Sequence, residues 1–236
     1  MPQTLKLRYN EMVKERFANE YELTKIEVDD DLAYMKAEKD GATMEHIYEA
    51  YKCEKIKKIR LAKLNAEGAV YVRNAVIVPC DNYDLPLFSY DIVESVNKLF
   101  AIIDIIPWRK TEEYRKKYVE PMKPIKEKHS NIPVLEKAKQ ELSDWGREFE
   151  SGYKFYLRCE KKYEPRVEEA FKDYLELYMG YLKEAVPIED EAIKKEILDY
   201  KKYYQEVYQK NDPGKGPVTV FFGKEWADRF FADFPF

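Results

Sequence analysis

The fold is decided by two neighbouring stretches of sequence, AVYVRNAVIVP at residues 69–79 and LPLFSYDIV at residues 85–93. Both stretches are rich in β-branched and aromatic residues, which favour strands. The turn sequence DNYD at residues 81–84 separates them, and a connection this short joins antiparallel neighbours. The two stretches therefore predict adjacent antiparallel strands in the middle of a sheet.

The strand pattern continues on both sides of this pair. Residues 43–53 and 56–64 precede it and are followed by the turn sequence NAEG at 65–68. Residues 99–107 come after a turn at Asn97 and Lys98 and are almost entirely apolar. Short turns between consecutive strands predict an antiparallel meander. Apolar residues occur on both faces of these strands, so each face of the sheet needs a covering layer.

Helical periodicity dominates the rest of the chain. Apolar residues recur at intervals of three and four, which is typical of helices that pack one face against a core. The predicted helices are residues 5–20, 133–151, 166–185, 189–210 and 225–232.

The last two of these helices are separated by Asp212-Pro213 and the loop GKGP at 214–217. Pro213 ends the longer helix because the residue before a proline avoids the α region. The GKGP loop has neither the spacing of a phosphate-binding loop nor, on this pattern, a helix after it. No linker divides the chain, so residues 1–236 are predicted to form one domain. The fold class is α/β, a three-layer α/β/α sandwich with a central antiparallel sheet.

The composition, 45% hydrophobic and 36% charged, is that of an ordinary globular domain. No apolar run reaches the roughly 18 residues of a membrane span, and the charged first 25 residues lack a signal-peptide core. We expect a monomeric cytoplasmic protein of a bacterium or a virus-infected host cell, with neither membrane nor nucleic acid as partner. A plastid location applies if a transit peptide has been removed.

Cysteine and histidine are scarce. Cys53, Cys80 and Cys159 are far apart with no CxxC motif, and His46 and His129 belong to no metal-binding motif. We therefore expect free thiols and no metal site. Nucleotide-binding glycine motifs are also absent from the sequence, so any redox chemistry must draw on another electron source.

Basic residues cluster in two stretches although the net charge is −4. Residues 52–63 form the first stretch and residues 109–128 the second. A solvated charged face explains each stretch in the simplest way. The functional alternative is a docking patch for an acidic protein, because local fields steer association whatever the net charge.

Three polar residues stand out. Asp91 lies mid-strand, where aspartate is depleted, and a carboxyl in an apolar pocket has its pKa raised and becomes a proton donor near neutrality. Asn74 interrupts a row of valines, and Asp212 follows a long helix. Taken singly, each fits a structural role: a solvent-facing or paired carboxylate, an amide bonded to the backbone, and a helix end.

From about residue 45 onward the sequence resembles the ferredoxin-dependent bilin reductases. The blocks that carry the resemblance are NAVIVP at 74–79, YDLPLF at 83–88, DIV at 91–93, AIID at 101–104 with Pro107, WG at 145–146 with Phe149, QKND at 209–212 and FGKEWADRF at 222–230. Their occurrence together and in this order is what makes the resemblance specific.

The resemblance implies a protein that binds biliverdin IXα between the sheet and the C-terminal helices. It implies no permanently bound cofactor: reduced ferredoxin supplies electrons singly, the enzyme supplies protons, and the reaction passes through bilin radicals. Asp91 matches the central proton-donating aspartate, and Asp212 matches the C-terminal aspartate of members that reduce the A-ring diene. Asn74 stands where members that form phycocyanobilin carry a histidine.

Two positions that touch bilin propionates in similar proteins differ here. Gln140, with Lys139 beside it, and Pro213 stand where basic residues are common. We expect Lys215 and Arg147 to take over propionate binding. Further expected contacts to the bilin are Phe88, Trp145, Tyr204 and Asn211.

The function that follows is reduction of biliverdin IXα to phycoerythrobilin, with ferredoxin docked on a basic patch. Three alternatives stay open: a two-electron reductase of 15,16-dihydrobiliverdin, a phytochromobilin-forming enzyme, and a bilin carrier without catalysis. The sequence leaves the electron count, the product and the source organism undecided.

Overall fold

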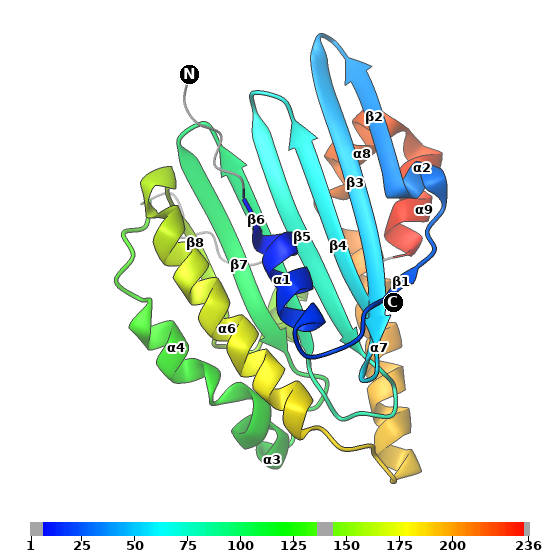
Figure 1. Ribbon diagram of the computed structural model, residues 1–236, viewed down its shortest axis with the longest axis vertical. Helices are drawn as coiled ribbons and strands as arrows, with labels where there is room; N and C mark the ends of the chain where they lie inside the picture. The colour runs from blue at the N-terminus through cyan, green and yellow to red at the C-terminus, as the bar shows by residue number, and fades with distance from the viewer. Residues whose placement is uncertain (1–6, 136–143, 234–236) are drawn as a thin grey trace.

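A computed structural model describes residues 7–135 and 144–233, and within them eight strands form one sheet (Figure 1). The strand order is β1-β3-β4-β5-β6-β7-β8 with β2 paired to β3, and every pairing is antiparallel. The strands are β1 (Thr24–Ile26), β2 (Tyr34–Lys39), β3 (Ala42–Cys53), β4 (Ile56–Ala66), β5 (Val70–Pro79), β6 (Leu87–Ser95), β7 (Lys98–Ile106) and β8 (Phe155–Glu160).

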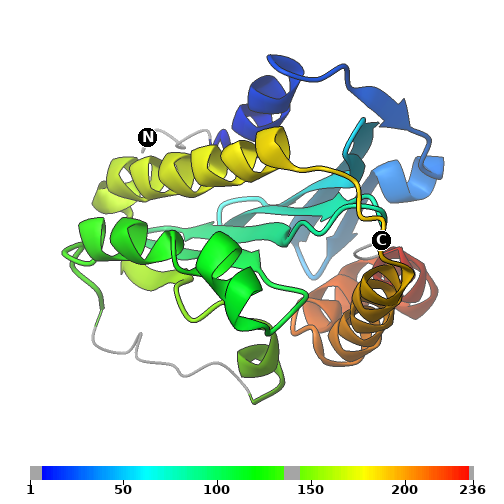
Figure 2. The ribbon, with the colours of Figure 1, turned by 90° about the horizontal axis from the view of Figure 1, so that it is seen from below.

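Helices cover the sheet on both faces, which confirms the three-layer α/β/α sandwich. In Figure 1, α1 and α6 lie in front of the sheet while α7, α8 and α9 lie behind it, and Figure 2 shows the same layers edge-on. The helices are α1 (Tyr9–Ala18), α2 (Asp30–Ala33), α3 (Glu112–Tyr114), the π-helical turn η1 (Arg115–Val119), α4 (Met122–Lys128), α5 (Asp144–Phe149), the 3₁₀ turn η3 (Lys161–Tyr163), α6 (Glu164–Glu184), α7 (Glu191–Asn211), α8 (Lys215–Phe222) and α9 (Lys224–Ala232).

The face that carries α1 and α6 is closed by a continuous apolar core. Every second residue of β4 to β8 points into it, as the period of two requires. On α6 the buried side chains recur at helical spacing: Val167, Phe171, Tyr174, Tyr178 and Leu182 are all fully buried. Among the aromatic contacts, Phe171 and Tyr90 meet edge to face with ring centroids 4.9 Å apart.

Two local predictions were wrong. Residues 133–151 were expected to form one helix, but residues 133–135 are not helical, α5 covers only Asp144–Phe149, and residues 136–143 lie outside the described part. The edge strand β8 follows within a few residues and was not predicted. The GKGP loop was expected to lack a following helix, yet α8 begins at Lys215. Pro217 is tolerated there because the first turn of a helix needs no backbone donor.

Candidate functional site

The second face of the sheet, beneath α7, α8 and α9, is not closed by one core. One apolar cluster joins β3 and β4 to α8 and α9, and another joins β5, β6 and β7 to α7. Asn74 lies where the two meet, since it pairs across strands with Ala62 of the first cluster and stands two residues before Val76 of the second. At this boundary Asn74 lies directly opposite a second polar residue, Asp91 on β6.

Around Asn74 and Asp91, several apolar side chains of the same face are only half-buried. We call them the open shelf, and its members are Leu64, Val72, Val93, Phe100, Ile102 and Tyr156. At the β8 end of the shelf, Arg158 places its guanidinium 5.3 Å from the centre of the Phe100 ring. A contiguous apolar surface left partly uncovered in the middle of a fold is typical of a ligand site.

Asp91 stands on β6 at the edge of the open shelf, directly opposite Asn74 on β5 and Ile102 on β7. Its Oδ1 atom is shielded from solvent and has no hydrogen-bond partner within the described residues. Burial raises the pKa of Asp91 to about 7, and the nearby negative charge of Asp212 contributes to the same rise. Asp91 can therefore hold a proton near neutral pH and release it to a basic group.

Asp212 reaches the same place from the end of α7, 121 positions further along the chain. Its Oδ1 atom accepts a hydrogen bond of 2.7 Å from the backbone N–H of Gly214, which fixes the turn into α8. Burial raises the pKa of Asp212, while the Gly214 N–H and the positive charge of Arg60 oppose that rise. Because like charges disfavour each other, ionised Asp212 favours a proton on Asp91.

Tyr208 and Tyr204 line the same region from α7. The two rings lie 4.4 Å apart, and the ring of Trp145 on α5 meets Tyr208 edge to face at 5.0 Å. Burial and the charges of Asp212, Asp104 and Asp91 raise the pKa of Tyr208 to about 12, although a hydrogen bond from Tyr204 opposes the rise. The Tyr208 hydroxyl thus stays neutral beside three carboxyl groups.

Asp104 is the third of these carboxyl groups and has a structural partner. Its side chain accepts hydrogen bonds from the backbone N–H and the hydroxyl of Ser151, just after α5. Burial raises the pKa of Asp104, and the two bonds to Ser151 oppose that rise. Asp104 therefore anchors the segment between α5 and β8, whereas Asp91 has no such anchor.

The residues expected at the site separate into two groups. Asp91, Asp212 and Asn74 come together, and Trp145 and Tyr204 join them through Tyr208. The expectation for Phe88 was wrong, because Phe88 is fully buried on the opposite face, with its ring centre 5.3 Å from that of Tyr178. The period of two required this, since Phe88 and Asp91 are three residues apart on one strand.

The expected propionate and loop contacts are not gathered around Asp91. Asn211 is exposed and donates to the carbonyl of Val207, and Lys215 forms an ion pair of 2.7 Å with Asp228. Arg147 is exposed on α5, and Lys139 and Gln140 lie outside the described residues.

Sequence reasoning missed Tyr208, Arg158 and the role of Arg60. Tyr208 lies in the predicted helix at 189–210 but was not singled out. Arg158 belongs to the strand that was not predicted. Arg60 was counted with the basic stretch at 52–63 but is only 1% exposed. The available signal for Arg60 was its strand position, since alternate residues of β4 point inward.

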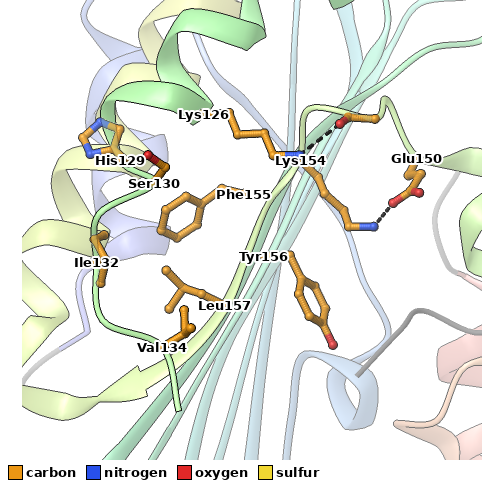
Figure 3. A pocket seen from close by; sticks show the side chains of 11 residues that line it. Lys126, His129, Ser130, Ile132, Val134, Glu150, Lys154, Phe155, Tyr156 and Leu157 are labelled. Atoms are coloured by element: carbon orange, nitrogen blue, oxygen red, sulfur yellow. Dashed lines mark hydrogen bonds and ion pairs between the residues drawn. The ribbon is translucent and has the colours of Figure 1, made fainter. Parts of the chain in front are cut away.

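A separate cavity of about 280 Å³ lies at the β8 edge, between that strand and the end of α4 (Figure 3). Its charged side chains are engaged, because Lys126 donates to the carbonyl of Gly152 at 3.1 Å and Lys154 pairs with Glu150. Ligand pockets usually measure about 300–1,000 Å³, so this cavity is small for a tetrapyrrole. Neither Asp91 nor Asp212 lines it.

Comparison with known proteins now adds to this geometry. The family model for the ferredoxin-dependent bilin reductases matches residues 10–236. The chain belongs to this family. It is a ferredoxin-dependent bilin oxidoreductase, which means that ferredoxin is its electron donor and a bilin its substrate.

Two relatives from Nostoc punctiforme carry different names. The 15,16-dihydrobiliverdin:ferredoxin oxidoreductase is 31% identical over 188 residues, which cover 79% of this chain and 76% of the relative. The phycoerythrobilin:ferredoxin oxidoreductase is 32% identical over 201 residues, which cover 79% and 73%. The chain is about equally similar to both relatives, so these comparisons do not distinguish which reduction step it catalyses.

Among solved structures, the tomato phytochromobilin synthase in complex with biliverdin superposes with a TM-score of 0.83. The match covers 95% of this chain and 80% of that protein, at 16% identity. At this identity the likeness shows the fold, an α/β/α sandwich. Within the described residues, no helix has the length and apolar character needed to cross a membrane, and no cluster of three potential metal ligands occurs.

Proposed function

We propose that this bilin reductase converts biliverdin IXα to phycoerythrobilin through two successive two-electron reductions, one of them at the A-ring diene. The observation that carries the proposal is the meeting of Asp91 and Asp212 on the α7 face of the sheet, which the helices cover only in part. Two acidic groups that arrive from different elements can serve different atoms of one extended substrate.

The bilin is placed on the open shelf, where its apolar rings would cover Val72, Val93 and Phe100. Each two-electron step takes two electrons from ferredoxin, one at a time, and two protons. An added electron makes the tetrapyrrole more basic, so a neutral carboxyl beside it can transfer a proton to carbon. Asp91 is the first donor in this scheme because its raised pKa of about 7 keeps it protonated near neutrality.

Asp212 is proposed as the donor for the A-ring step. Its charge interacts with Asp91, and it arrives from a different element, at the end of α7. Propionate binding is assigned to Arg158, beside the previously expected Arg147 and Lys215. Arg158 is the most direct of the three, since it stands on the same face as Val93 and Phe100.

Asp212→Asn tests the division of labour between the carboxyls. We expect biliverdin to be consumed at a rate within about threefold of wild type while a dihydrobilin accumulates, because the second protonation lacks its donor. The loss of one general acid slows a step by about 10²- to 10⁴-fold. Chromatography of anaerobic time points measures both species. If the variant forms the wild-type product at the wild-type rate, Asp212 has only a structural role at the end of α7.

The overall reaction is decided by anaerobic assays with reduced ferredoxin and either biliverdin IXα or 15,16-dihydrobiliverdin. Phycoerythrobilin from both substrates supports the proposal. Product from dihydrobiliverdin alone would assign a two-electron reductase, and phytochromobilin from biliverdin would assign A-ring reduction only. Bound but unreduced bilin in both assays would favour a carrier.

The setting of the enzyme belongs to the same proposal. We infer a single-domain, monomeric protein of the cytoplasm of a bacterium or a virus-infected cell, or of a plastid if a transit peptide has been removed. Fractionation of the source cells tests the location. Ferredoxin is proposed to dock on the exposed basic residues of η1 and α4, whose charges face water.

A further inference from the structure

Among the described residues, Arg60 is the most deeply buried cation of the second face. It stands on β4 and is 1% exposed. Its guanidinium lies 4.5 Å from the centre of the Phe230 ring and 5.1 Å from that of Tyr48. A buried charge is costly unless it makes strong contacts, and stacking on aromatic rings offsets part of that cost. The position of the charge therefore calls for a reason beyond packing.

Arg60 shares a hydrogen bond with Tyr48, and another of its hydrogen bonds is directed toward the site. Its Nη1 atom donates to Oδ1 of Asn74 at 3.1 Å. The nearby carboxylate of Asp233 has other partners, because the hydroxyl of Tyr48 donates to it and Lys58 pairs with it at 2.9 Å. Arg60 is thus not needed as the partner of Asp233.

We propose that Arg60 is a positioning residue that fixes the orientation of the Asn74 amide and, through it, the hydrogen-bond donor that the bilin meets beside Asp91. This inference rests on the proposed bilin site but adds a residue and a role to it. The buried Arg60 would thus decide whether the half-buried amide of Asn74 presents its N–H group or its oxygen to the substrate.

The chemistry of the two side chains permits one arrangement. Arginine has only donors, so the Asn74 oxygen must face Arg60; a flipped amide would bring two sets of N–H groups together. The Asn74 nitrogen then lies on the β6 side, where it donates to the carbonyl of Tyr90 at 3.2 Å. An amide nitrogen has two hydrogens, so one N–H remains for a ligand on the strand next to Asp91.

The charge of Arg60 has a second consequence for the carboxyls. It lowers the pKa of Asp212 against the effect of burial, while the charge of Asp212 raises the pKa of Asp91. Arg60 thereby favours Asp91 over Asp212 as the carboxyl that holds the first proton, in keeping with Asp91 as the first donor. Pairs of acids whose environments separate their pKa values often divide catalytic roles in this way.

The test compares Arg60→Met, Asn74→Ala and the double variant. If Arg60 acts through Asn74, each single variant shifts the absorption band of bound biliverdin in the same direction, and the double variant matches Asn74→Ala. We expect turnover to fall about ten- to a hundredfold in Arg60→Met, as displaced active-site groups do, with the dissociation constant of biliverdin within about threefold. Independent effects of the two substitutions on the band would overturn the proposal.

Arg73→Met is the matched control. Arg73 also stands in the central sheet and donates to an asparagine, Oδ1 of Asn65 at 2.9 Å, but on the opposite face. It should lower thermal stability without moving the bilin band. Should Arg60→Met fail to fold, Arg60→Lys replaces it. Lysine keeps the charge but lacks the planar guanidinium, so it should give a smaller band shift in the same direction. An unshifted band in Arg60→Lys with lost stability would mean a structural role only.

The band is read in the bilin complex without ferredoxin. Failure of the proposed reduction would therefore leave this test intact. Conversely, a wild-type band in Arg60→Met would remove the positioning role even if phycoerythrobilin formation is established.

Discussion

The two faces of the central sheet use the same strands in opposite ways. On the α6 face, side chains such as Ile77, Phe88 and Tyr90 are fully buried. On the α7 face of the same strands, Asn74, Asp91 and Val93 are only half-buried. Because successive residues alternate between the faces, one stretch of sequence builds a packed core on one face and a partly covered surface on the other.

The difference shows on which face of the sheet a titratable carboxyl is buried at a cost in stability. Among the described residues both faces hold buried polar atoms without a hydrogen-bond partner, such as the hydroxyl of Tyr178 on the α6 face, but the carboxyl whose pKa is raised to about 7, Asp91, stands on the α7 face. Active sites often carry such destabilising groups, since stability elsewhere compensates for them. Substitutions on the two faces should therefore separate activity from stability.

The largest effect is expected for Asp91→Asn. An amide has nearly the shape of the carboxyl but no acidic proton, so bilin binding should persist while product formation falls by about 10²- to 10⁴-fold. Absorption titration under anaerobic conditions measures binding, and chromatography measures product. Ser89→Ala, on the same face of the same strand, is the matched control and should keep most of the activity. Wild-type turnover in Asp91→Asn would remove Asp91 as a proton donor.

The sequence allowed β3 to β7 to be predicted because these segments have strand-like composition and recognisable turns separate β4, β5, β6 and β7. It did not reveal β8, since Phe155–Glu160 mixes charged and apolar residues after a helical pattern. Asp91 was recognisable as an odd residue in a strand, but its meeting with Asp212 depends on how α7 returns to the sheet. The burial of Arg60 was not foreseen, because the neighbouring lysines obscure the alternation of buried and exposed side chains along β4.

The next prediction compares two phenylalanines on opposite faces. Phe88→Ala should lower the free energy of unfolding by about 3–5 kcal/mol, as for other fully buried rings, and leave the product unchanged. Phe100→Ala removes a half-buried ring of the open shelf, so we expect about 1–2 kcal/mol and weaker bilin binding. Chemical denaturation and bilin titration measure the two quantities. Equal stability losses would contradict the difference between the faces.

The pH dependence of stability gives a third comparison, made without bilin. The pKa of Asp91 is raised from 3.8 to about 7 in the folded state, so its protonated form favours folding and that contribution is lost as pH rises from about 4 through 7. At about 1.4 kcal/mol for each unit of pH, the loss is at most roughly 4 kcal/mol. Relative to wild type, Asp91→Asn should therefore gain stability between pH 4 and pH 8. A constant difference between the two proteins would contradict the raised pKa.

The smallest effect concerns the two basic stretches proposed for ferredoxin docking. In the stretch at 52–63, Lys58 and Arg60 are buried and Lys63 pairs with Glu11, so few charges remain to attract a partner. In the stretch at 109–128, Arg115 is exposed on η1 and Lys123 is exposed near the start of α4.

Exposed charges act mainly on the rate of association. Arg115→Glu with Lys123→Glu should raise the KM for ferredoxin by about five- to tenfold at low salt, and the difference from wild type should shrink near 0.5 M salt, where the screening length is only a few ångströms. Lys52→Glu with Lys57→Glu changes the net charge equally and should have less than about a twofold effect. If both double variants behave alike, net charge rather than a defined surface steers ferredoxin to this enzyme.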